Sequence, residues 1–482
     1  MSYPNHTVEK IGGTSMSKVH ELRDTLLIGA REDLYHRIFV VSAFGGITNK
    51  LLEHKKSGTP GVYALFSNDD NAHGWLDALT EVADAMRDAH RVVLEHSADI
   101  HAADEFVRER IEGARSCLFD LQRLCSYGHF KLSDHMLSIR ELLSGLGESH
   151  SAYVTTLMLQ RSGVNARFVD LSGWRDESEP DLQERIKMGL EQVDLNTELP
   201  IVTGYAQCRE GLMREFDRGY SEVTFSTIAA STGADEAIIH KEFHLSSADP
   251  KLVGEGAVRK LGHTNYDVAD QLSNMGMEAI HPKAAKILRK SGIPLRVANA
   301  FEPEDPGTLI DEKAAETPQV EIVTGLPVTA FEVFEQDMVG VKGYDHGVLE
   351  VLTRHKVRIV SKATNANTIT HYVDAPLKAM RRVERDVMKA FPNAQVRMNR
   401  MALVAAIGRD LEGLSTTERG LKALRTGGVK TLAVQHVPGS VDVQFLLSQD
   451  SQDAAIRILH EALVEEGAQT SKSEASDHLR VA

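Results

Sequence analysis

The stretch Val8-Glu-Lys-Ile-Gly-Gly-Thr-Ser15 decides the fold, because a short extended run passes directly into a glycine turn. Apolar residues at helical spacing follow the turn and indicate a helix. A second stretch, Arg37-Ile-Phe-Val-Val-Ser-Ala-Phe-Gly-Gly-Ile-Thr48, has the same order of a buried-type strand and a glycine loop. Two such junctions in succession predict a parallel sheet of the α/β class.

Strand patterns return four more times before residue 310, separated by helical stretches. These strands are expected at Ala166–Asp170, Leu199–Thr203, Ala237–His240 and Pro294–Ala298. Between residues 72 and 159 the pattern is helical, with Trp75, Leu79, Val82, Met86 and Val93 on one face. We therefore expect one α/β domain over residues 1–310, in which a parallel-rich central sheet lies between helices and carries a helical excursion.

The chain changes character after this domain. The stretch Phe301–Thr317 is rich in proline and acid, which is typical of an interdomain linker, and we predict a linker over residues 311–327. Beyond them the order strand, helix, strand, strand, helix occurs twice. This repeat predicts two ferredoxin-like modules over residues 328–395 and 396–467. The last residues, 468–482, are polar and are expected to form a frayed tail.

The composition is that of a globular protein, with 42% apolar and 26% charged residues among 482. A formal charge of -15 argues against binding to nucleic acid or to an anionic membrane. The longest apolar run, Met401 to Ile407, is far shorter than the roughly 20 residues that span a bilayer. The N-terminal stretch has no signal-like apolar run, so we expect a cytoplasmic protein. Cys117, Cys125 and Cys208 are too few for a disulfide framework and are expected to be buried.

Glycines directly after strands let backbone N–H groups converge on an anion, and phosphate is the natural ligand of such a loop. Lys10 precedes the first loop, where its ammonium would neutralise the oxygens of a transferring phosphoryl group. The alternative is a tight strand-to-helix turn with a surface lysine. Neither a Gly-x-x-x-x-Gly-Lys-Ser/Thr loop nor a Gly-x-Gly-x-x-Gly fingerprint follows a strand, which disfavours P-loop and Rossmann proteins.

Seven motifs follow one another along the chain in the order in which aspartokinases carry them. They are Lys10-Ile-Gly-Gly-Thr-Ser15, Val40-Val-Ser-Ala-Phe-Gly-Gly-Ile-Thr48, Gly147-Glu-Ser-His-Ser151, Val202-Thr-Gly-Tyr205, Asp249-Pro-Lys251, Gly276-Met-Glu-Ala-Ile-His-Pro282 and Pro306-Gly-Thr308. From about Val8 to Glu466 the chain resembles this family, whose members have the amino acid kinase fold followed by two ACT modules. The two small repeats match that plan.

The resemblance implies that ATP, with Mg²⁺, phosphorylates the side-chain carboxylate of L-aspartate to 4-phospho-L-aspartate, the first step of aspartate-derived amino-acid biosynthesis. This chemistry fits the residues, because a carboxylate with a pKa of about 3.9 is already ionised at neutral pH and needs no general base. Catalysis then reduces to positioning and charge stabilisation.

By resemblance, the site residues fall into three groups. The catalytic residues are Lys10 and Glu222. The aspartate-binding residues are Ser42, Thr48, Glu148, Arg218 and Ser221, with Arg218 on the α-carboxylate and Glu148 on the α-amine. The residues at ATP and its phosphates are Gly12, Gly13, Thr14, Gly45, Gly46, His240, Lys241 and Lys251.

ACT modules pair across chains and bind amino acids at their interface, so the resemblance also implies a homodimer with an amino-acid effector. The residues expected near the effector are Met338, Asp345, Asn365 and Asn367. The usual Pro-Gly at the start of the module helix is replaced by Asp345-His-Gly347 in the first module, and the second has Thr417-Glu-Arg-Gly420. Both changes argue against effector binding.

Other motifs also depart from the family pattern. The family's Gly-Arg-Gly-Gly-Ser-Asp reads Asp217-Arg-Gly-Tyr-Ser-Glu222, its Trp-Thr-Asp-Val-Asp-Gly reads Ile239-His-Lys-Glu-Phe-His244, and a usual lysine is Glu278. His240 and His244 are four residues apart, but they have no third ligand in the sequence, so we expect no metal site. Two alternatives follow: a non-catalytic amino-acid-sensing regulatory subunit, or a kinase of another amino acid such as acylated glutamate, although those kinases lack paired ACT modules.

Overall fold

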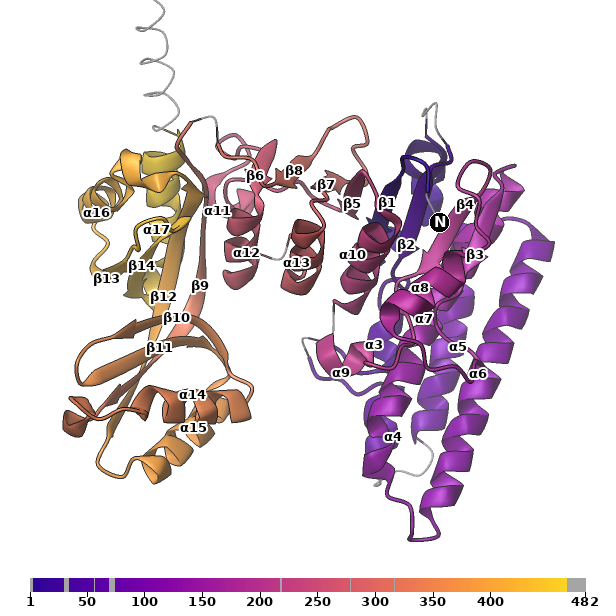
Figure 1. Cartoon of the computed structure of the whole chain (residues 1–482), viewed down its shortest axis with the longest axis horizontal. Helices are drawn as coiled ribbons and strands as arrows, with labels where there is room; N and C mark the ends of the chain where they lie inside the picture. The colour runs from indigo at the N-terminus through magenta and orange to yellow at the C-terminus, as the bar shows by residue number, and fades with distance from the viewer. Residues whose placement is uncertain are drawn as a thin grey trace, which may run out of the picture. The chain divides into compact units, whose positions relative to one another are not determined.

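The computed structural model describes residues 3–29, 34–55, 57–68, 74–216, 219–277, 279–315 and 317–465. The chain forms two compact units (Figure 1). The first unit contains Met1–Leu245 and Ile280–Glu312, and the second contains Ser246–Ala279 and Lys313–Ala482. The chain therefore leaves the first unit after Leu245 and returns at Ile280. The prediction of one continuous domain over residues 1–310 did not include this departure of Ser246–Ala279 into the second unit.

The first unit is built on a largely parallel sheet. Its strands are β1 (Thr7–Ile11), β2 (Arg37–Val41), β3 (Ala166–Val169), β4 (Leu199–Thr203), β5 (Glu236–Lys241), β7 (Leu295–Asn299) and β8 (Thr308–Asp311). They lie in the order β3-β4-β2-β1-β5-β7-β8, and every neighbouring pair is parallel except β7 and β8. All residues of β2 and β4 are buried, as expected for central strands of a parallel sheet. The predicted α/β class is confirmed.

Helices complete this unit. They are α1 (Gly13–Met16), α2 (Val19–Leu22), α3 (Ile47–Leu51), α4 (Val62–Ser67), α5 (Gly74–Val93), α6 (Ser97–Cys125), α7 (Met136–Arg161), α8 (Leu182–Leu190), α9 (Leu212–Phe216), α10 (Tyr220–Thr232) and α13 (Pro282–Lys290). The long helices α5, α6 and α7 pack against one another and form the predicted helical excursion (Figure 1). The apolar face predicted for α5 is buried from Trp75 to Val93. Helix α7 also lies against β3 and β4, which brings its middle to the sheet.

The second unit carries an antiparallel sheet. Its elements are α11 (Pro250–Val253), β6 (His263–Asn265), α12 (Tyr266–Asn274), β9 (Gln319–Phe334), α14 (Tyr344–Arg354), β10 (Arg358–Thr364), β11 (Thr368–Asp374), α15 (Leu377–Ala390), β12 (Gln395–Arg409), α16 (Thr416–Thr426), β13 (Thr431–Gln435), β14 (Asp442–Ser448) and α17 (Gln452–His460). The sheet order is β10-β11-β9-β12-β14-β13, with antiparallel pairing throughout. The doubled order strand, helix, strand, strand, helix occurs as predicted.

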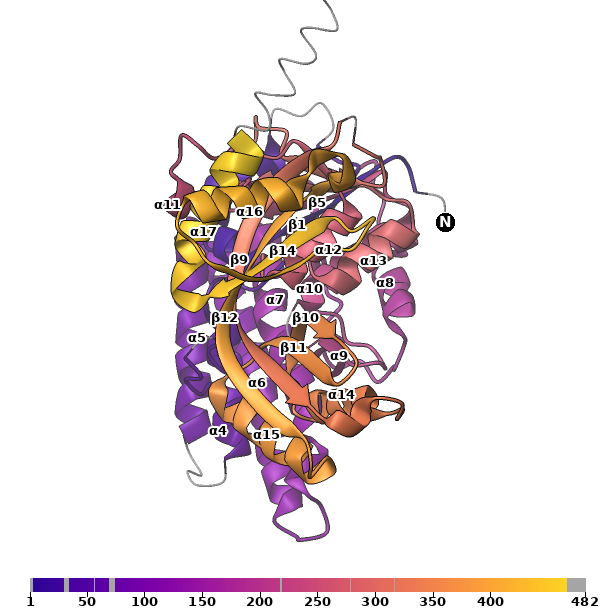
Figure 2. The ribbon, with the colours of Figure 1, turned by 90° about the vertical axis from the view of Figure 1, so that its left-hand side faces the viewer.

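The two modules of this unit share their longest strands. β9 and β12 pair with each other along their whole lengths, and both run through the two modules (Figures 1 and 2). The first half of β9 supplies Val320 and Val323 to the apolar core of the second module. Its second half supplies Phe331 and Val333 to the core of the first module. The sheet of the first module uses the second half of β9 and the first half of β12. The sheet of the second module uses the first half of β9 and the second half of β12. The two modules therefore share both long strands.

This exchange changes the expected module boundaries. β9 begins at Gln319, inside the predicted linker 311–327. The start of β12, from Gln395, lies beside the second half of β9 and so belongs to the first module's sheet. The acidic, proline-containing sequence obscured this strand, in which residues 320–324 are all buried. Local composition does not report a partner strand far along the chain.

The cysteines differ from expectation. Cys208 is buried, but Cys125 is half-buried and Cys117 is exposed, so the prediction of three buried cysteines is wrong. Both exceptions lie on the long helix α6, where only one face packs. No helix among the described residues has the length and apolarity needed to cross a bilayer. The predicted tail 468–482 lies outside the described residues.

Replacement of Gly420 in α16 by alanine tests the packing of the second module. A Cβ at this position would lie 2.5 Å from Phe445 Cζ and 3.2 Å from Leu459 Cδ2, and both side chains are fully buried. We expect Gly420→Ala to destabilise the unit by about 1–3 kcal/mol through overpacking, despite the better helix propensity of alanine. Thermal unfolding measures this effect. Gly413→Ala, which meets no atom within 4 Å, is the control, and an unchanged or higher Tm for Gly420→Ala would contradict the packing described.

Candidate active site

The candidate site lies where parallel strands end. The glycine loops follow β1 and β2, and Gly204 follows β4. Because these strands are parallel, their carboxyl ends share one edge of the sheet, which is where α/β proteins bind ligands. Lys10 lies near the end of β1 and is 5% exposed, so the alternative of a surface lysine is wrong.

The ammonium of Lys10 faces a carboxylate from α10. Lys10 Nζ lies 3.9 Å from Glu222 Oε1, and both side chains are largely buried. Glu222 Oε2 accepts a hydrogen bond from the backbone N–H of His281. The two predicted catalytic residues are therefore in contact, and Glu222 also ties the start of α10 to the start of α13.

Glu148 enters the site from the middle of α7. It is 3% exposed, and burial raises the pKa of its carboxyl to about 8. The nearby ammonium of Lys10 opposes this rise, as do hydrogen bonds from Tyr220 and from backbone groups. Glu148 Oε2 is buried and has no hydrogen-bond partner among the described residues. A buried acceptor of this kind is suited to a cationic or hydrogen-bond-donating ligand group.

Gly204 makes room for this carboxylate. A Cβ on Gly204 would lie 3.0 Å from Glu148 Oε2, 2.7 Å from Ser221 Cβ and 2.9 Å from Val41 O. The motif Val202-Thr-Gly-Tyr205 supported the family resemblance, but this glycine was not assigned a role. Glycine is needed here for steric reasons, because a Cβ would collide with residues of the neighbouring elements. The sequence alone does not show which residues those are.

Hydroxyl groups surround the same point. Ser42 Oγ and Ser221 Oγ lie 3.4 Å apart, so the loop after β2 meets the start of α10. The Ser151 hydroxyl donates to Ser42 O at 2.8 Å and fixes that loop to α7. Thr48 is half-buried in the first turn of α3. The structure thus brings Ser42, Ser221 and Glu148 together, as the resemblance implied.

The two glycine loops differ in how available their N–H groups are. The Gly45 N–H donates to Ser17 Oγ at 2.8 Å, so this predicted phosphate donor is engaged by a side chain. Gly46 has φ +85 and begins α3 in the left-handed region, which glycine adopts without strain. A Cβ on Gly13 would lie 3.0 Å from Ala43 O, so the loops are packed closely. Thr14 is exposed beside them.

Three residues singled out in the sequence, Arg218, Asp217 and Glu278, lie outside the described residues. Tyr220, which replaces a family glycine, is buried and hydrogen-bonds to Glu148. That substitution therefore adds a donor to the site, a role that the sequence comparison did not predict.

The side chain of His240 is buried and contacts a carboxylate of β1. It is 2% exposed, and its Nε2 lies 2.7 Å from Glu9 Oε2. Glu9 also accepts from Arg37 Nε at 2.7 Å. The carboxyl of Glu9 is fully buried, yet Arg37 and the hydrogen bond from His240 hold its pKa well below the usual range. The imidazole of His240 is thus held by a carboxylate of β1, and its predicted role at ATP stays a prediction. Neither Glu9 nor Arg37 was predicted.

Lys241, which is expected near ATP, and His244, which is not, are more open than His240. Lys241 Nζ lies 5.9 Å from the ring centroid of Phe243 at the end of β5. His244 lies between two carboxylates, with Nε2 3.0 Å from Glu302 Oε2 and Nδ1 3.7 Å from Asp305 Oδ1. These three residues could hold a metal ion, whereas the sequence analysis found no third ligand for His244. Each ring nitrogen faces a different carboxylate, which also fits an imidazole bridging the two.

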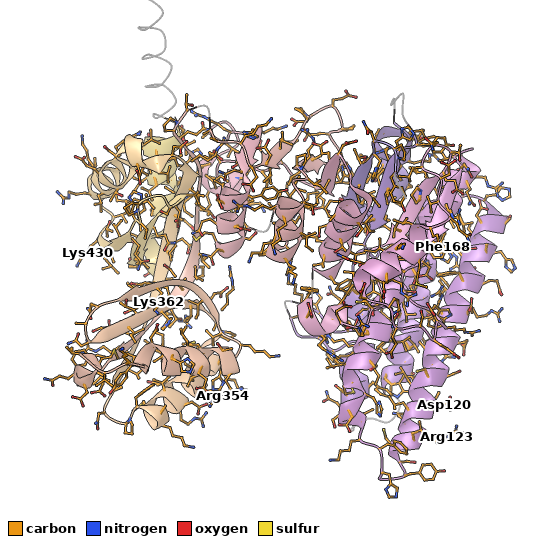
Figure 3. The ribbon with its side chains drawn as sticks, viewed as in Figure 1. Asp120, Arg123, Phe168, Arg354, Lys362 and Lys430 are labelled. Carbon is orange, nitrogen blue, oxygen red and sulfur yellow. The ribbon has the colours of Figure 1, made fainter. Side chains whose placement is uncertain are left out.

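The remaining predicted residues belong to the second unit. Lys251 is in α11, whose first turn is capped by Asp249. Asp345 of α14 accepts a hydrogen bond from Lys362 Nζ of β10 at 2.5 Å. Figure 3 labels Lys362 on this strand. Met338 is buried in the core of the first module, and the backbone groups of Asn365 and Asn367 hold the turn between β10 and β11. Their predicted role toward an effector stays a prediction.

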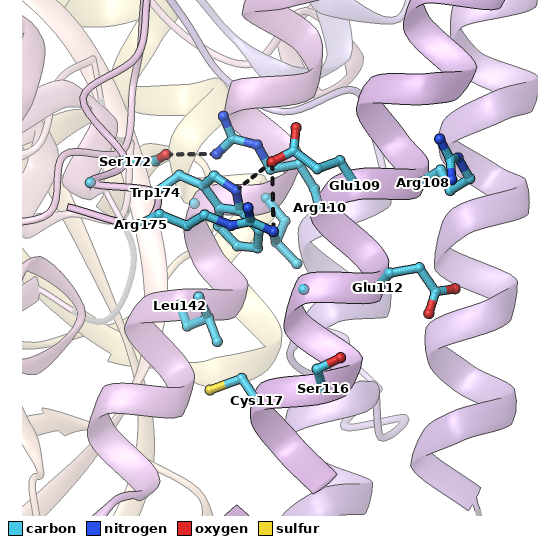
Figure 4. A pocket seen from close by; sticks show the side chains of 14 residues that line it. Arg108, Glu109, Arg110, Glu112, Ser116, Cys117, Leu142, Ser172, Trp174 and Arg175 are labelled. Atoms are coloured by element: carbon cyan, nitrogen blue, oxygen red, sulfur yellow. Dashed lines mark hydrogen bonds and ion pairs between the residues drawn. The ribbon is translucent and has the colours of Figure 1, made fainter. Parts of the chain in front are cut away.

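A cavity of about 570 Å³ lies elsewhere in the first unit, between α6, α7 and the segment after β3 (Figure 4). The Arg110 guanidinium lies 4.7 Å from the Trp174 ring centroid and pairs with Asp170 at 2.6 Å. None of the described candidate-site residues lines this cavity. It is therefore a different surface from the site at the ends of the strands.

Comparison with known proteins identifies the family. The model of the amino acid kinase family matches residues 5–299, so the chain belongs to that family. Aspartate kinase Ask_Ect of Stutzerimonas stutzeri (strain A1501) is 48% identical over 464 residues, which cover 95% of this chain and 98% of that protein. Aspartokinase 3, chloroplastic, of Arabidopsis thaliana is 23% identical and covers 95% of this chain and 81% of its own length. Among amino acid kinases, the chain therefore falls with the aspartate kinases.

A solved structure supports the same fold. The E. coli aspartokinase III structure in complex with aspartate and ADP has a TM-score of 0.69, at 19% identity, over 95% of this chain and all of that chain. The form of that enzyme with lysine and aspartate has a TM-score of 0.68 at 20% identity. The expected amino acid kinase fold followed by ACT modules is thus confirmed. The comparisons support a kinase and not the alternative of a non-catalytic subunit.

The raised pKa of Glu148 predicts a dependence of stability on pH. Because its folded-state pKa of about 8 exceeds the value of about 4.5 expected in an unfolded chain, the folded protein binds the extra proton. This contribution to stability is full below pH 4.5 and is lost as the pH rises toward 8. We therefore expect Glu148→Gln, which cannot ionise, to gain stability relative to the unaltered protein over that range.

Thermal unfolding of both proteins between pH 5 and 8 measures this difference. Glu81→Gln, which removes an exposed carboxylate, is the matched control and should follow the unaltered protein. A constant difference in Tm across the range would show that the Glu148 pKa is not raised.

Proposed function

We propose that this chain transfers the γ-phosphoryl group of ATP to the side-chain carboxylate of L-aspartate and produces 4-phospho-L-aspartate. The observation that carries the proposal is the buried ammonium of Lys10, which lies beside Glu222 and close to Glu148 at the ends of the parallel strands. One cation, one unsatisfied carboxylate and several hydroxyls suit a ligand that carries both an ammonium and carboxylates. The 48% identity to an aspartate kinase supports the same substrate.

In the proposed mechanism Lys10 stabilises the phosphoryl group as it is transferred. The side-chain carboxylate of aspartate is ionised at neutral pH and attacks without a general base. Glu222 holds the Lys10 ammonium in place and is the partner it leaves when phosphate oxygens arrive. The N–H groups of Gly12 and Gly13 add donors at the phosphates.

Glu148 is proposed to bind the α-ammonium of aspartate. An ammonium beside this carboxylate lowers its pKa, so Glu148 ionises when aspartate binds. Ser42, Ser221 and Thr48 donate to the substrate's carboxylates. Arg218 is proposed for the α-carboxylate, on the family resemblance alone.

Mg²⁺ is proposed to accompany ATP. Mg²⁺ takes oxygen ligands and is usually held by substrate phosphates with one or two carboxylates. The donor set at the strand ends fits this requirement, because Glu222 and Glu242 present carboxylates there, and Glu242 accepts from the Ser15 hydroxyl at 2.9 Å. When bound, the ion would neutralise charge on the phosphates.

Replacement of Lys10 tests the function directly. We expect Lys10→Met to lower the rate of ATP-dependent aspartyl phosphate formation by about 10²–10³, because a cation at the developing charge is lost. Trapping the product with hydroxylamine as aspartyl hydroxamate measures this rate. Lys50→Met removes a half-exposed lysine of α3 and should keep full activity. A Lys10→Met rate within tenfold of the unaltered protein would refute the role of Lys10, and no product from the unaltered protein would refute the function.

We further propose that the ACT modules pair two chains and bind an amino-acid effector, as the resemblance implies, despite the loss of the usual Pro-Gly in both modules. Sedimentation of the intact protein should give twice the chain mass of 53.1 kDa. The hydroxamate assay, repeated with end products of aspartate-derived pathways, should identify an inhibitor. A monomer that is insensitive to all of them would contradict both parts of the proposal.

A further inference from the structure

Helix α7 carries a second carboxylate on the face from which Glu148 enters the candidate site. Glu141, Gly145 and Glu148 follow one another at intervals of four and three residues. Side chains at this spacing lie above one another on a helix, so the two carboxylates are separated by about 10 Å along the axis of α7. The glycine between them leaves room for a side chain from another element.

Tyr205, which follows β4, occupies this room. A Cβ on Gly145 would lie 3.0 Å from Tyr205 Cδ1 and 3.3 Å from its Cε1, so the ring lies directly against α7 at this glycine. The Tyr205 hydroxyl donates to Glu141 Oε2 at 2.6 Å. The backbone N–H of the same residue donates to Glu148. Tyr205 therefore connects the two carboxylates of α7.

The bond between Tyr205 and Glu141 is of the strong, charge-assisted kind. Its O–O distance of 2.6 Å is typical of a hydroxyl that donates to a carboxylate. Burial, together with the charge of Glu141, holds the pKa of the Tyr205 hydroxyl well above its usual range, so the hydroxyl keeps its proton at neutral pH. Tyr205 is 2% exposed, and its backbone O accepts from the Thr203 hydroxyl at 2.8 Å. Both ends of this residue are therefore fixed.

Glu141 also holds the start of α9. Its Oε1 accepts from the backbone N–H of Met213 at 2.8 Å and from that of Arg214 at 3.2 Å. The first N–H groups of a helix have no partner within it, so this carboxylate supplies one. Helix α9 precedes α10 in the chain, and α10 begins with Tyr220. The two oxygens of Glu141 thus fix Tyr205 and the segment that leads to Tyr220.

Tyr220 completes the arrangement around Glu148. Its ring packs edge-on against that of Tyr205, with ring centroids 5.7 Å apart, and its hydroxyl bonds to Glu148. A shift of Tyr205 would therefore move two donors to Glu148, its own N–H and the Tyr220 hydroxyl. With these donors in place, Glu148 Oε2 is the oxygen that has no hydrogen-bond partner among the described residues.

We propose that Glu141 is a positioning residue for the α-ammonium of aspartate. It acts through Tyr205 on Glu148 and does not touch the substrate itself. The inference rests on the proposed function for its ligand, and it adds the residues that set the affinity for the amino group. A carboxylate that is already oriented before the ligand arrives binds more tightly, because less ordering is needed on binding.

The test is calorimetric binding of L-aspartate to the intact protein. We expect Tyr205→Phe, which keeps the ring and removes only the hydroxyl, to weaken binding about five- to tenfold. Glu141→Leu should weaken binding at least as much, because it also releases the start of α9. Glu141→Gln should bind within about twofold of the unaltered protein, because its amide can accept from the Met213 N–H and donate to the Tyr205 oxygen.

Tyr153→Phe is the matched control. Tyr153 is also a tyrosine at α7, but its ring packs against Phe106 of α6 and Phe168 of β3, so loss of its hydroxyl should not change aspartate affinity. Affinity for Mg²⁺ with a non-hydrolysable ATP analogue should stay the same in every variant. A merely structural role for Glu141 would lower Tm without a selective loss of aspartate affinity.

Three results would overturn the proposal: unchanged aspartate affinity in Tyr205→Phe and Glu141→Leu, an equal loss of affinity for aspartate and nucleotide, or a loss in Glu141→Gln as large as in Glu141→Leu. If Glu141→Leu does not fold, Tyr205→Phe decides the question. The calorimetric measurement needs no phosphoryl transfer. An unaltered protein that binds aspartate but forms no aspartyl hydroxamate would therefore refute the proposed function alone.

Discussion

A charged side chain on each face of β1 imposes the main constraint on the first unit. Glu9 and Lys10 are neighbours in sequence, so they point to opposite faces of the strand, and both are buried. A buried charge is tolerated only when it is paired and hydrogen-bonded. On one face Arg37 forms an ion pair with Glu9, and His240 lies at hydrogen-bond distance from it; on the other face Glu222 faces Lys10.

The buried charges of Glu9 and Lys10 differ in how closely their partners surround them. The Glu9 cluster is closed on the carboxylate, because Arg37 also donates to two backbone carbonyls and His240 Nε2 lies 2.7 Å from Glu9 Oε2. The charges around Lys10 are less tightly paired. Glu222 lies 3.9 Å from its ammonium, and among the described residues Glu148 Oε2 is buried without a hydrogen-bond partner. The closed cluster fixes β1 between its neighbours, and the open one can exchange its internal contacts for substrate groups.

The sequence predicted the strands of the first sheet and the doubled module order well, because burial patterns and glycine turns are local signals. It placed Ser42, Ser221, Glu148 and Lys10 in one site only through the family resemblance. Glu9, Arg37 and Tyr220 were missed, since their roles depend on partners that lie far along the chain. The contact between His240 and Glu9 was missed for the same reason: motif position does not tell which residues meet across neighbouring strands.

The shared strands of the second unit bear on how the protein is made. The first half of β9 leaves the ribosome before the first module exists, yet its partners in the second module, β12 and α17, follow some 80 to 140 residues later. Neither four-stranded sheet can close until β12 has been synthesised. Pairings of such long sequence separation slow folding. We therefore expect the two modules to fold together in one late cooperative step. A cut between the modules would leave two incomplete sheets.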